Sequence, residues 1–88
     1  MKTIWKFPMT PTDISVIAMP RGAQVLCVQT QNGTPCLWAL VTTTAPEVHR
    51  KFRTYGTGHK HDAIEGRYIG TYQLSDGLLV FHVFEDAQ

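Results

Sequence analysis

The chain has 88 residues, of which 43% are apolar and 17% are charged, and its formal net charge is +1. This length allows one domain with a small core, and the apolar content excludes a disordered polypeptide. The near-neutral charge argues against an extended nucleic-acid surface, and no apolar run reaches the roughly 20 residues that cross a bilayer. We therefore expect a single domain over residues 1–88. We expect it to be cytoplasmic, since the first residues lack the apolar core of a signal peptide.

Apolar residues occur in short runs that are rich in β-branched and aromatic side chains and are interrupted by turn residues. This pattern predicts an all-β domain, because an amphipathic helix would repeat its apolar residues roughly every three to four positions. The expected strands, in chain order, cover residues 2–7, 14–19, 23–31, 34–43, 48–55, 67–75 and 78–85. We expect these six to seven strands to form one small antiparallel sandwich or barrel built from hairpins.

Two dipeptides, Asn32-Gly33 and Asp76-Gly77, mark hairpin turns, because these residues accept the positive φ angles of a type I′ turn. The first register then pairs Val28 with Leu37, Cys27 with Trp38 and Val25 with Leu40. The second register pairs Tyr72 with Phe81, Leu74 with Leu79 and Thr71 with His82. Both hairpins carry apolar residues on both faces. This favours either central strands of a closed barrel or sandwich, or a face that a second copy covers in a homodimer.

The residue types that carry catalysis are present, but they are not arranged for it. Cys27 and Cys36 are diagonal neighbours in the expected register, so we expect two reduced thiols that are inert in apolar strands. Ser15 and Ser75 lack the sharp turn that exposes a nucleophilic serine. The sequence therefore predicts a protein without enzymatic activity and without a cofactor.

The segment from Val48 to His61 is the strongest candidate for a binding site. On a strand, alternate residues from His49 to Tyr55 share one face, and they lead into the glycine-spaced loop Gly56-Thr57-Gly58. Glycine lets backbone N–H groups converge on an anion, and Arg or Lys side chains complete a phosphate or carboxylate site. The candidate binding residues are Arg53, Tyr55, Gly56, Thr57, Gly58, His59, Lys60, His61 and Arg67.

Alternatives to an anion site stay open at this segment. Residues 48–61 also fit an edge strand whose charged side chains prevent pairing with another chain and which is followed by a solvated turn. They fit equally a loop that binds a protein. His59 and His61 could chelate a metal from alternate positions, but no second clustered pair of ligands accompanies them. His82 lies within an apolar run and is interpreted as a core or interface histidine. The aromatic residues are interpreted mainly as core.

Six segments of the chain are distinctive in combination. They are Ile4-Trp5-Lys6-Phe7-Pro8, Met19–Ala23, Val28–Val41, Tyr55–His59, Tyr68–Leu74 and Leu79–Glu85. Together they resemble a small, uncharacterised family of phage and prophage proteins over nearly the whole chain. The resemblance implies a viral or mobile-element origin and a one-domain product, and it implies no established activity. Members of that family carry an apolar residue or proline after the loop histidine, where this chain has Lys60-His61.

Phage accessory proteins of this size are often stoichiometric binders, so the resemblance implies a function of that kind. We therefore expect a non-enzymatic binding protein that occupies a host protein, with inhibition of a host defence system as one outcome. One alternative is a protein that sequesters a nucleotide or another anionic small molecule at the glycine-spaced loop. A second alternative is a minor structural protein of the phage particle. No membrane partner is expected, and nucleic acid is a disfavoured partner.

Overall fold

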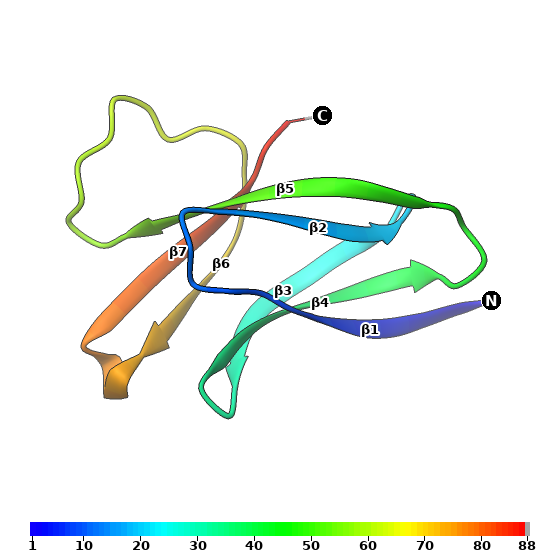
Figure 1. Cartoon of the computed structure of the whole chain (residues 1–88), viewed down its shortest axis with the longest axis horizontal. Helices are drawn as coiled ribbons and strands as arrows, with labels where there is room; N and C mark the ends of the chain where they lie inside the picture. The colour runs from blue at the N-terminus through cyan, green and yellow to red at the C-terminus, as the bar shows by residue number, and fades with distance from the viewer. Residues whose placement is uncertain (88) are drawn as a thin grey trace.

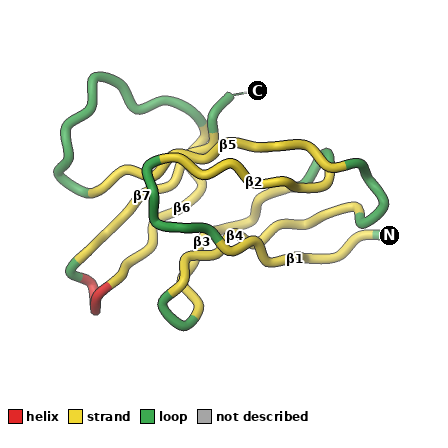
Figure 2. Tube along the Cα trace, viewed as in Figure 1, coloured by secondary structure: helices red, strands yellow, loops and turns green. Residues whose placement is uncertain are grey.

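The computed structural model describes residues 1–87 and contains seven strands in two antiparallel sheets (Figure 1, Figure 2). The three-stranded sheet has the order β1 (Lys2–Pro8), β4 (Thr34–Thr42) and β3 (Gln24–Gln31). The four-stranded sheet has the order β2 (Ile14–Pro20), β5 (Glu47–Gly56), β7 (Leu79–Glu85) and β6 (Arg67–Leu74). The predicted all-β class is confirmed, and each strand lies within one residue of its predicted ends. The described residues contain no helix with the length and apolar character needed to span a membrane.

The core lies between the two sheets and is built from alternate strand residues. Leu37, Ala39 and Val41 point inward from β4 and are almost completely buried. Phe52 from β5 and Val83 from β7 meet them from the other sheet and are also fully buried. Burying a large apolar side chain contributes about 1.5–3 kcal/mol, so these alternate positions hold the sheets together.

The two sheets approach one another closely where β3 and β6 lie side by side (Figure 1). These strands belong to different sheets and form no ladder with each other. A Cβ atom at Gly70 of β6 would lie 2.7 Å from Cγ1 of Val28 in β3. Gly70 therefore permits a close contact between the sheets that a larger residue would prevent.

The register of the first hairpin is confirmed except at one position. The confirmed pairs are Val28 with Leu37 and Cys27 with Trp38. Val25 was expected to face Leu40, but it faces Ala39. The prediction is wrong there because Leu26 is an extra residue on β3 that opposes no residue of β4 and forms a β-bulge.

Both predicted turns occur at the expected places, but only the first has the predicted form. Asn32 and Gly33 have φ angles of 51° and 79°, as a type I′ turn requires. In the second hairpin the predicted register is confirmed for Tyr72 with Phe81, Leu74 with Leu79 and Thr71 with His82. Its turn is wider than predicted, because Leu74 with Leu79 is the last pair and Ser75, Asp76 and Gly77 between them all have positive φ.

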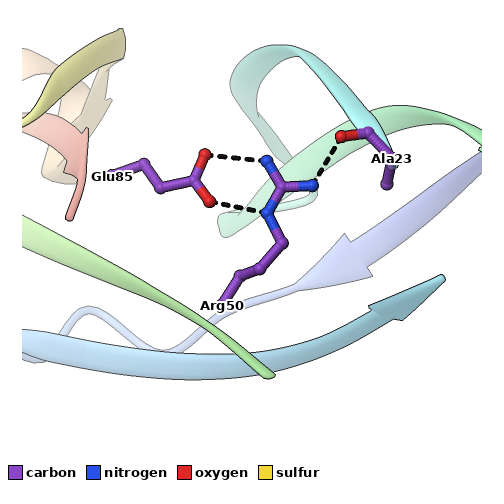
Figure 3. A network of polar contacts seen from close by, with 3 residues as sticks. All are labelled: Ala23, Arg50 and Glu85. Atoms are coloured by element: carbon purple, nitrogen blue, oxygen red, sulfur yellow. Dashed lines mark hydrogen bonds and ion pairs between the residues drawn. The ribbon is translucent and has the colours of Figure 1, made fainter. Parts of the chain in front are cut away.

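A buried ion pair joins β5 to β7 within the four-stranded sheet, and its arginine also bonds to the other sheet. Arg50 of β5 donates from Nε and Nη2 to the two carboxylate oxygens of Glu85, at 2.6 and 2.8 Å (Figure 3). Its Nη1 donates to the backbone carbonyl of Ala23, which immediately precedes β3 in the other sheet. The Arg50 and Glu85 side chains are only 12% and 8% exposed. Arg50 is therefore a structural residue, although it belongs to the most basic part of the sequence.

Candidate functional site

The strand that carries the predicted basic face, β5, lies between β2 and β7 in the four-stranded sheet. The interpretation of this segment as an edge strand is therefore wrong, because β2 pairs with residues 47–53 on one side and β7 with residues 52–56 on the other. Phe52 and Thr54 of β5 are buried. The alternate residues from His49 to Tyr55 consequently point away from the core, as the period of two predicts. They lie on the outer face of the four-stranded sheet, and this face carries the candidate site.

Three aromatic rings form a row across this outer face: Tyr55 in β5, Phe84 in β7 and Tyr68 in β6. The ring centroids of Tyr55 and Phe84 are 5.7 Å apart with an interplanar angle of 76°. Those of Tyr68 and Phe84 are 5.4 Å apart at 62°. His61 extends the row, because its ring meets that of Tyr55 edge-on with centroids 4.7 Å apart. Such pairs contribute about 0.5–1.5 kcal/mol each beyond their buried area, so the row is held in a defined geometry.

A long loop of residues 57–66 joins β5 to β6 (Figure 1). A cavity of about 310 Å³ lies between this loop and the aromatic row. The residues that line it are Tyr55, Gly56, Thr57, Gly58, His59, Ile64, Tyr68, His82 and Phe84. We call it the aromatic cavity. Its volume is at the lower end of the range of about 300–1,000 Å³ that is typical of ligand pockets. The aromatic cavity therefore suits one side chain or one small ring system.

A chain of hydrogen bonds through His82 connects the two sides of the aromatic cavity. Thr57 Oγ1 donates to the Val80 carbonyl at 3.1 Å, so its oxygen accepts the bond from His82 Nε2 at 2.7 Å. Nδ1 of the same ring is hydrogen-bonded to the Thr71 hydroxyl at 2.9 Å. The Thr71 hydroxyl is in turn hydrogen-bonded to the phenol of Tyr68 at 2.6 Å. Both ring nitrogens of His82 are thus bonded within the protein. This series of hydrogen bonds holds the Tyr68 side chain, which forms one wall of the cavity, in a fixed position relative to the loop.

The loop backbone has fewer free donors than the predicted anion site requires. The N–H of Thr57 donates to the Val80 carbonyl at 3.0 Å, and that of His59 donates to the Gly56 carbonyl at 3.2 Å. The His59 ring folds over Gly56, where a Cβ atom would lie 2.7 Å from its Cε1. Two of the amides that were expected to converge on an anion are therefore already bonded. The geometry favours an apolar occupant over a phosphate.

Arg53, which pairs with Phe84 of the aromatic row, is held by a carboxylate. Its Nε donates to Asp86 at 2.8 Å, and Lys51 Nζ lies 4.0 Å from the same carboxylate group. The hydrogen bond to Asp86, followed by the negative charge of that group, raises the pKa of Arg53. These cations form an ionic border beside the aromatic cavity and do not contribute to its lining.

The other predicted basic residues are dispersed. Lys60 and His61 are exposed on the loop, and the lining of the aromatic cavity does not include them. Arg67 borders a separate cavity of about 670 Å³, together with Arg21 and the buried Arg50. Of the predicted binding residues, the structure therefore brings Tyr55 to His59 together at one cavity and places Arg53, Lys60, His61 and Arg67 outside it.

Four residues of the cavity lining were not among the predicted site residues: Ile64, Tyr68, His82 and Phe84. The interpretation of Tyr68 and Phe84 as core is wrong, because Tyr68 is exposed and Phe84 is half-buried on the outer face. His82 lies in the cavity wall and not in the core. Strand periodicity places His82 and Phe84 on one face of β7, and the predicted pair of Thr71 with His82 places Thr71 beside them. This predicted register was the sequence feature from which His82 and Phe84 could have been identified as site residues.

Neither the cysteines nor the ligand-type side chains add a reactive site to this description. Both cysteines are free, as predicted, with Cys36 buried and Cys27 half-buried. Within residues 1–87, no group of three or more His, Cys, Asp or Glu is placed to hold a metal ion. The aromatic cavity is therefore the site for which the described residues provide a chemical rationale.

Searches among curated proteins and among solved structures return no match to this chain. A family model matches residues 1–88, which is the full length of the sequence. The matched region includes every segment that resembles the phage and prophage proteins, and the description of the family assigns neither an activity nor an origin. The chain belongs to the family described as a domain of unknown function, DUF7352.

Proposed function

We propose that this protein is a non-enzymatic binding module that acts by occupying a partner protein, which inserts one apolar or aromatic side chain into the aromatic cavity. The nature of the cavity lining carries the proposal. Tyr55, Tyr68 and Phe84 provide aromatic walls, and both nitrogens of His82 are bonded within the chain. Interfaces obtain most of their binding energy from a few aromatic or similar anchors that enter well-packed pockets.

The surroundings of the aromatic cavity support a protein as the partner. Ile14 and Val16 of β2 pair with Arg53 and Lys51, so all four lie on the same outer face as Tyr55. Ile14, Val16, Ile64 and Tyr68 are each between 45% and 59% exposed. A group of exposed apolar side chains bordered by charged residues is typical of a protein-interaction surface.

A host protein is the partner class that we favour, because the sequence resembles phage and prophage proteins. Small accessory proteins from that setting act by occupying host factors, and inhibition of a host defence system would follow from such occupation. A phosphate-bearing ligand is less well supported, since the amides of Thr57 and His59 and the guanidinium of Arg53 are engaged within the chain.

Replacing Ile64 by aspartate is expected to abolish capture of the partner by the immobilised protein from host lysate. A carboxylate at the cavity wall would have to lose its hydration when an apolar side chain enters, at a cost of several kcal/mol. Capture is quantified by mass spectrometry on wild-type and variant protein. Leu78→Asp is the matched control, because Leu78 is 84% exposed on the turn between β6 and β7, away from the loop of residues 57–66.

The control is expected to retain the partner at the wild-type level, because it adds the same charge at an aliphatic position outside the cavity. Circular dichroism and melting curves establish that both variants remain folded. Equal recovery of the partner by the Ile64 variant and by the wild-type protein would contradict the role of the aromatic cavity. Failure of the wild-type protein to retain any protein from several hosts would contradict the proposed function itself.

A further inference from the structure

A second apolar surface lies on the opposite side of the sandwich, on the outer face of the three-stranded sheet. The strand register arranges its side chains in rows that run across β1, β4 and β3. The rows are Pro8–Cys36–Gln29, Lys6–Trp38–Cys27 and Ile4–Leu40–Gln24. The bulge residue Leu26 lies between the last two rows on β3, and both Ile4 and Leu26 are exposed. At the centre of this face Trp38 and Leu40 are half-buried and Cys36 is buried, and Lys6 Nζ of β1 donates across it to Gln31 Oε1 of β3 at 2.7 Å. The outer face therefore presents apolar side chains that the described chain covers only in part.

All charged residues of this sheet belong to β1, the strand at one edge. The sequence from residue 22 to residue 46 contains no Asp, Glu, Lys, Arg or His, so β3 and β4 are uncharged. Lys2 and Lys6 are the charged side chains of β1, and their partners Thr42 and Trp38 place them on the outer face. The strand at the other edge, β3, offers the neutral amides of Gln24 and Gln29.

We propose that a second copy of this chain covers this face, related by a two-fold axis that runs parallel to the strands. This symmetry stacks β4 on β4 of the second copy, so Trp38 and Leu40 of both copies meet at the centre. It also places β1 of each copy over β3 of the other. One N–H of Lys6 donates to Gln31 Oε1 of its own chain at 2.7 Å. Its remaining N–H groups then face the uncharged edge of the other copy, where the side-chain carbonyl groups of Gln24 and Gln29 are acceptors for an ammonium group.

The charge distribution selects this axis over the alternatives. A two-fold axis perpendicular to the strands would stack β1 on β1 and bring the Lys2 and Lys6 side chains of both copies together, where like charges repel. Sheets stacked face to face keep their strands within about 30° of each other, which a parallel axis allows. The dimer uses the face opposite the aromatic cavity, so it leaves that cavity open and does not depend on its proposed function.

Sedimentation equilibrium over the micromolar-to-millimolar range tests the dimer directly. The wild-type chain is expected to reach twice the monomer mass. Ile4→Glu is expected to raise the dissociation constant by at least about tenfold, because it places an unpaired carboxylate in the apolar centre. Val16→Glu is the matched control: Val16 is similarly exposed on an edge strand of the other sheet, and its variant is expected to dimerise like the wild type.

A cysteine introduced in place of Lys6 tests the proposed axis. Lys6 and Cys27 both pair with Trp38 from opposite sides, so within one chain they are separated by two strand spacings, about 9–10 Å. A disulfide needs Cβ atoms within about 4.5 Å, so oxidation can join these positions only between copies. Lys6→Cys is expected to give a covalent dimer through Cys27 on a non-reducing gel. Lys2→Cys, on the same edge but beyond the end of β3, is expected to stay monomeric there.

Three results would overturn the inference. The first is a wild-type chain that stays monomeric over the whole concentration range. The second is a dimer that Ile4→Glu leaves unchanged while the variant remains folded by circular dichroism, because the interface would then lie elsewhere. The third is a Lys6→Cys chain that dimerises without forming the interchain disulfide, or that forms it no faster than Lys2→Cys. That result would exclude the parallel axis.

Discussion

Gly66→Ala is expected to lower the free energy of unfolding by at least about 2–3 kcal/mol, even though residue 66 is exposed. The backbone of Gly66 has a φ angle of 98°, which side-chain-bearing residues rarely adopt. A Cβ atom there would also collide with the backbone carbonyl oxygen of Glu85. Both effects force the start of β6 away from the end of β7, next to the buried ion pair. Urea unfolding, followed by circular dichroism, measures the loss.

Gly58→Ala is the matched control for this prediction. Gly58 has a similar φ angle of 84°, but the space around its missing Cβ atom is open. Its substitution therefore measures only the free-energy cost of placing a residue with a side chain at positive φ, which is about 1 kcal/mol. Equal losses for the two variants would show that the close approach of Gly66 to Glu85 makes no difference to stability.

Arg50→Met is expected to destabilise the fold by about 3–5 kcal/mol. The substitution leaves the Glu85 carboxylate buried without its cation and removes the hydrogen bond to the Ala23 carbonyl in the other sheet. Methionine keeps most of the aliphatic volume of the arginine side chain. The loss in the free energy of unfolding therefore reflects the broken ion pair more than the creation of a cavity. Chemical denaturation gives the change in the free energy of unfolding at constant pH.

Two further variants separate the ion pair from general effects of charge removal. Arg53→Met breaks the pair with Asp86, whose members are 39% and 26% exposed, and is expected to cost less than about 1 kcal/mol. Combining Arg50→Met with Glu85→Leu is expected to recover a large part of the loss, because neither charge then remains unpaired. A double variant as unstable as Arg50→Met alone would contradict this explanation.

Much of the fold follows from local features of the sequence. The strands could be located because Gly, Pro and Asn residues punctuate runs of β-branched and aromatic side chains. The first turn was predictable because Asn32 and Gly33 tolerate positive φ. The bulge at Leu26 has no such signal, since an extra residue in an apolar strand does not disturb its composition. The bulge changes the partner of Val25 and leaves the Leu26 side chain on the outer face.

The candidate site could be predicted only in part, because it depends on which strands are neighbours. Residues 55–59 are contiguous, and their glycines and polar groups identify them as a loop. The order β2-β5-β7-β6 brings Tyr68 and Phe84 beside Tyr55, and local periodicity does not specify strand order. The same limit applies to Arg50, whose partner Glu85 lies 35 positions later. Nothing in its local sequence indicates that this basic residue belongs to the interior, because its burial depends on that long-range partner.

The most direct measurement is an NMR titration of ¹⁵N-labelled protein with two small probes in separate experiments. Indole represents an aromatic side chain, and inorganic phosphate represents the anion that the glycine-spaced loop was first expected to bind. We predict that indole shifts the amide signals of residues 56–59, Ile64 and Tyr68 in a saturable way, and that phosphate leaves them unchanged. Saturable shifts with phosphate at these residues, together with no response to indole, would contradict an aromatic cavity built for an apolar anchor.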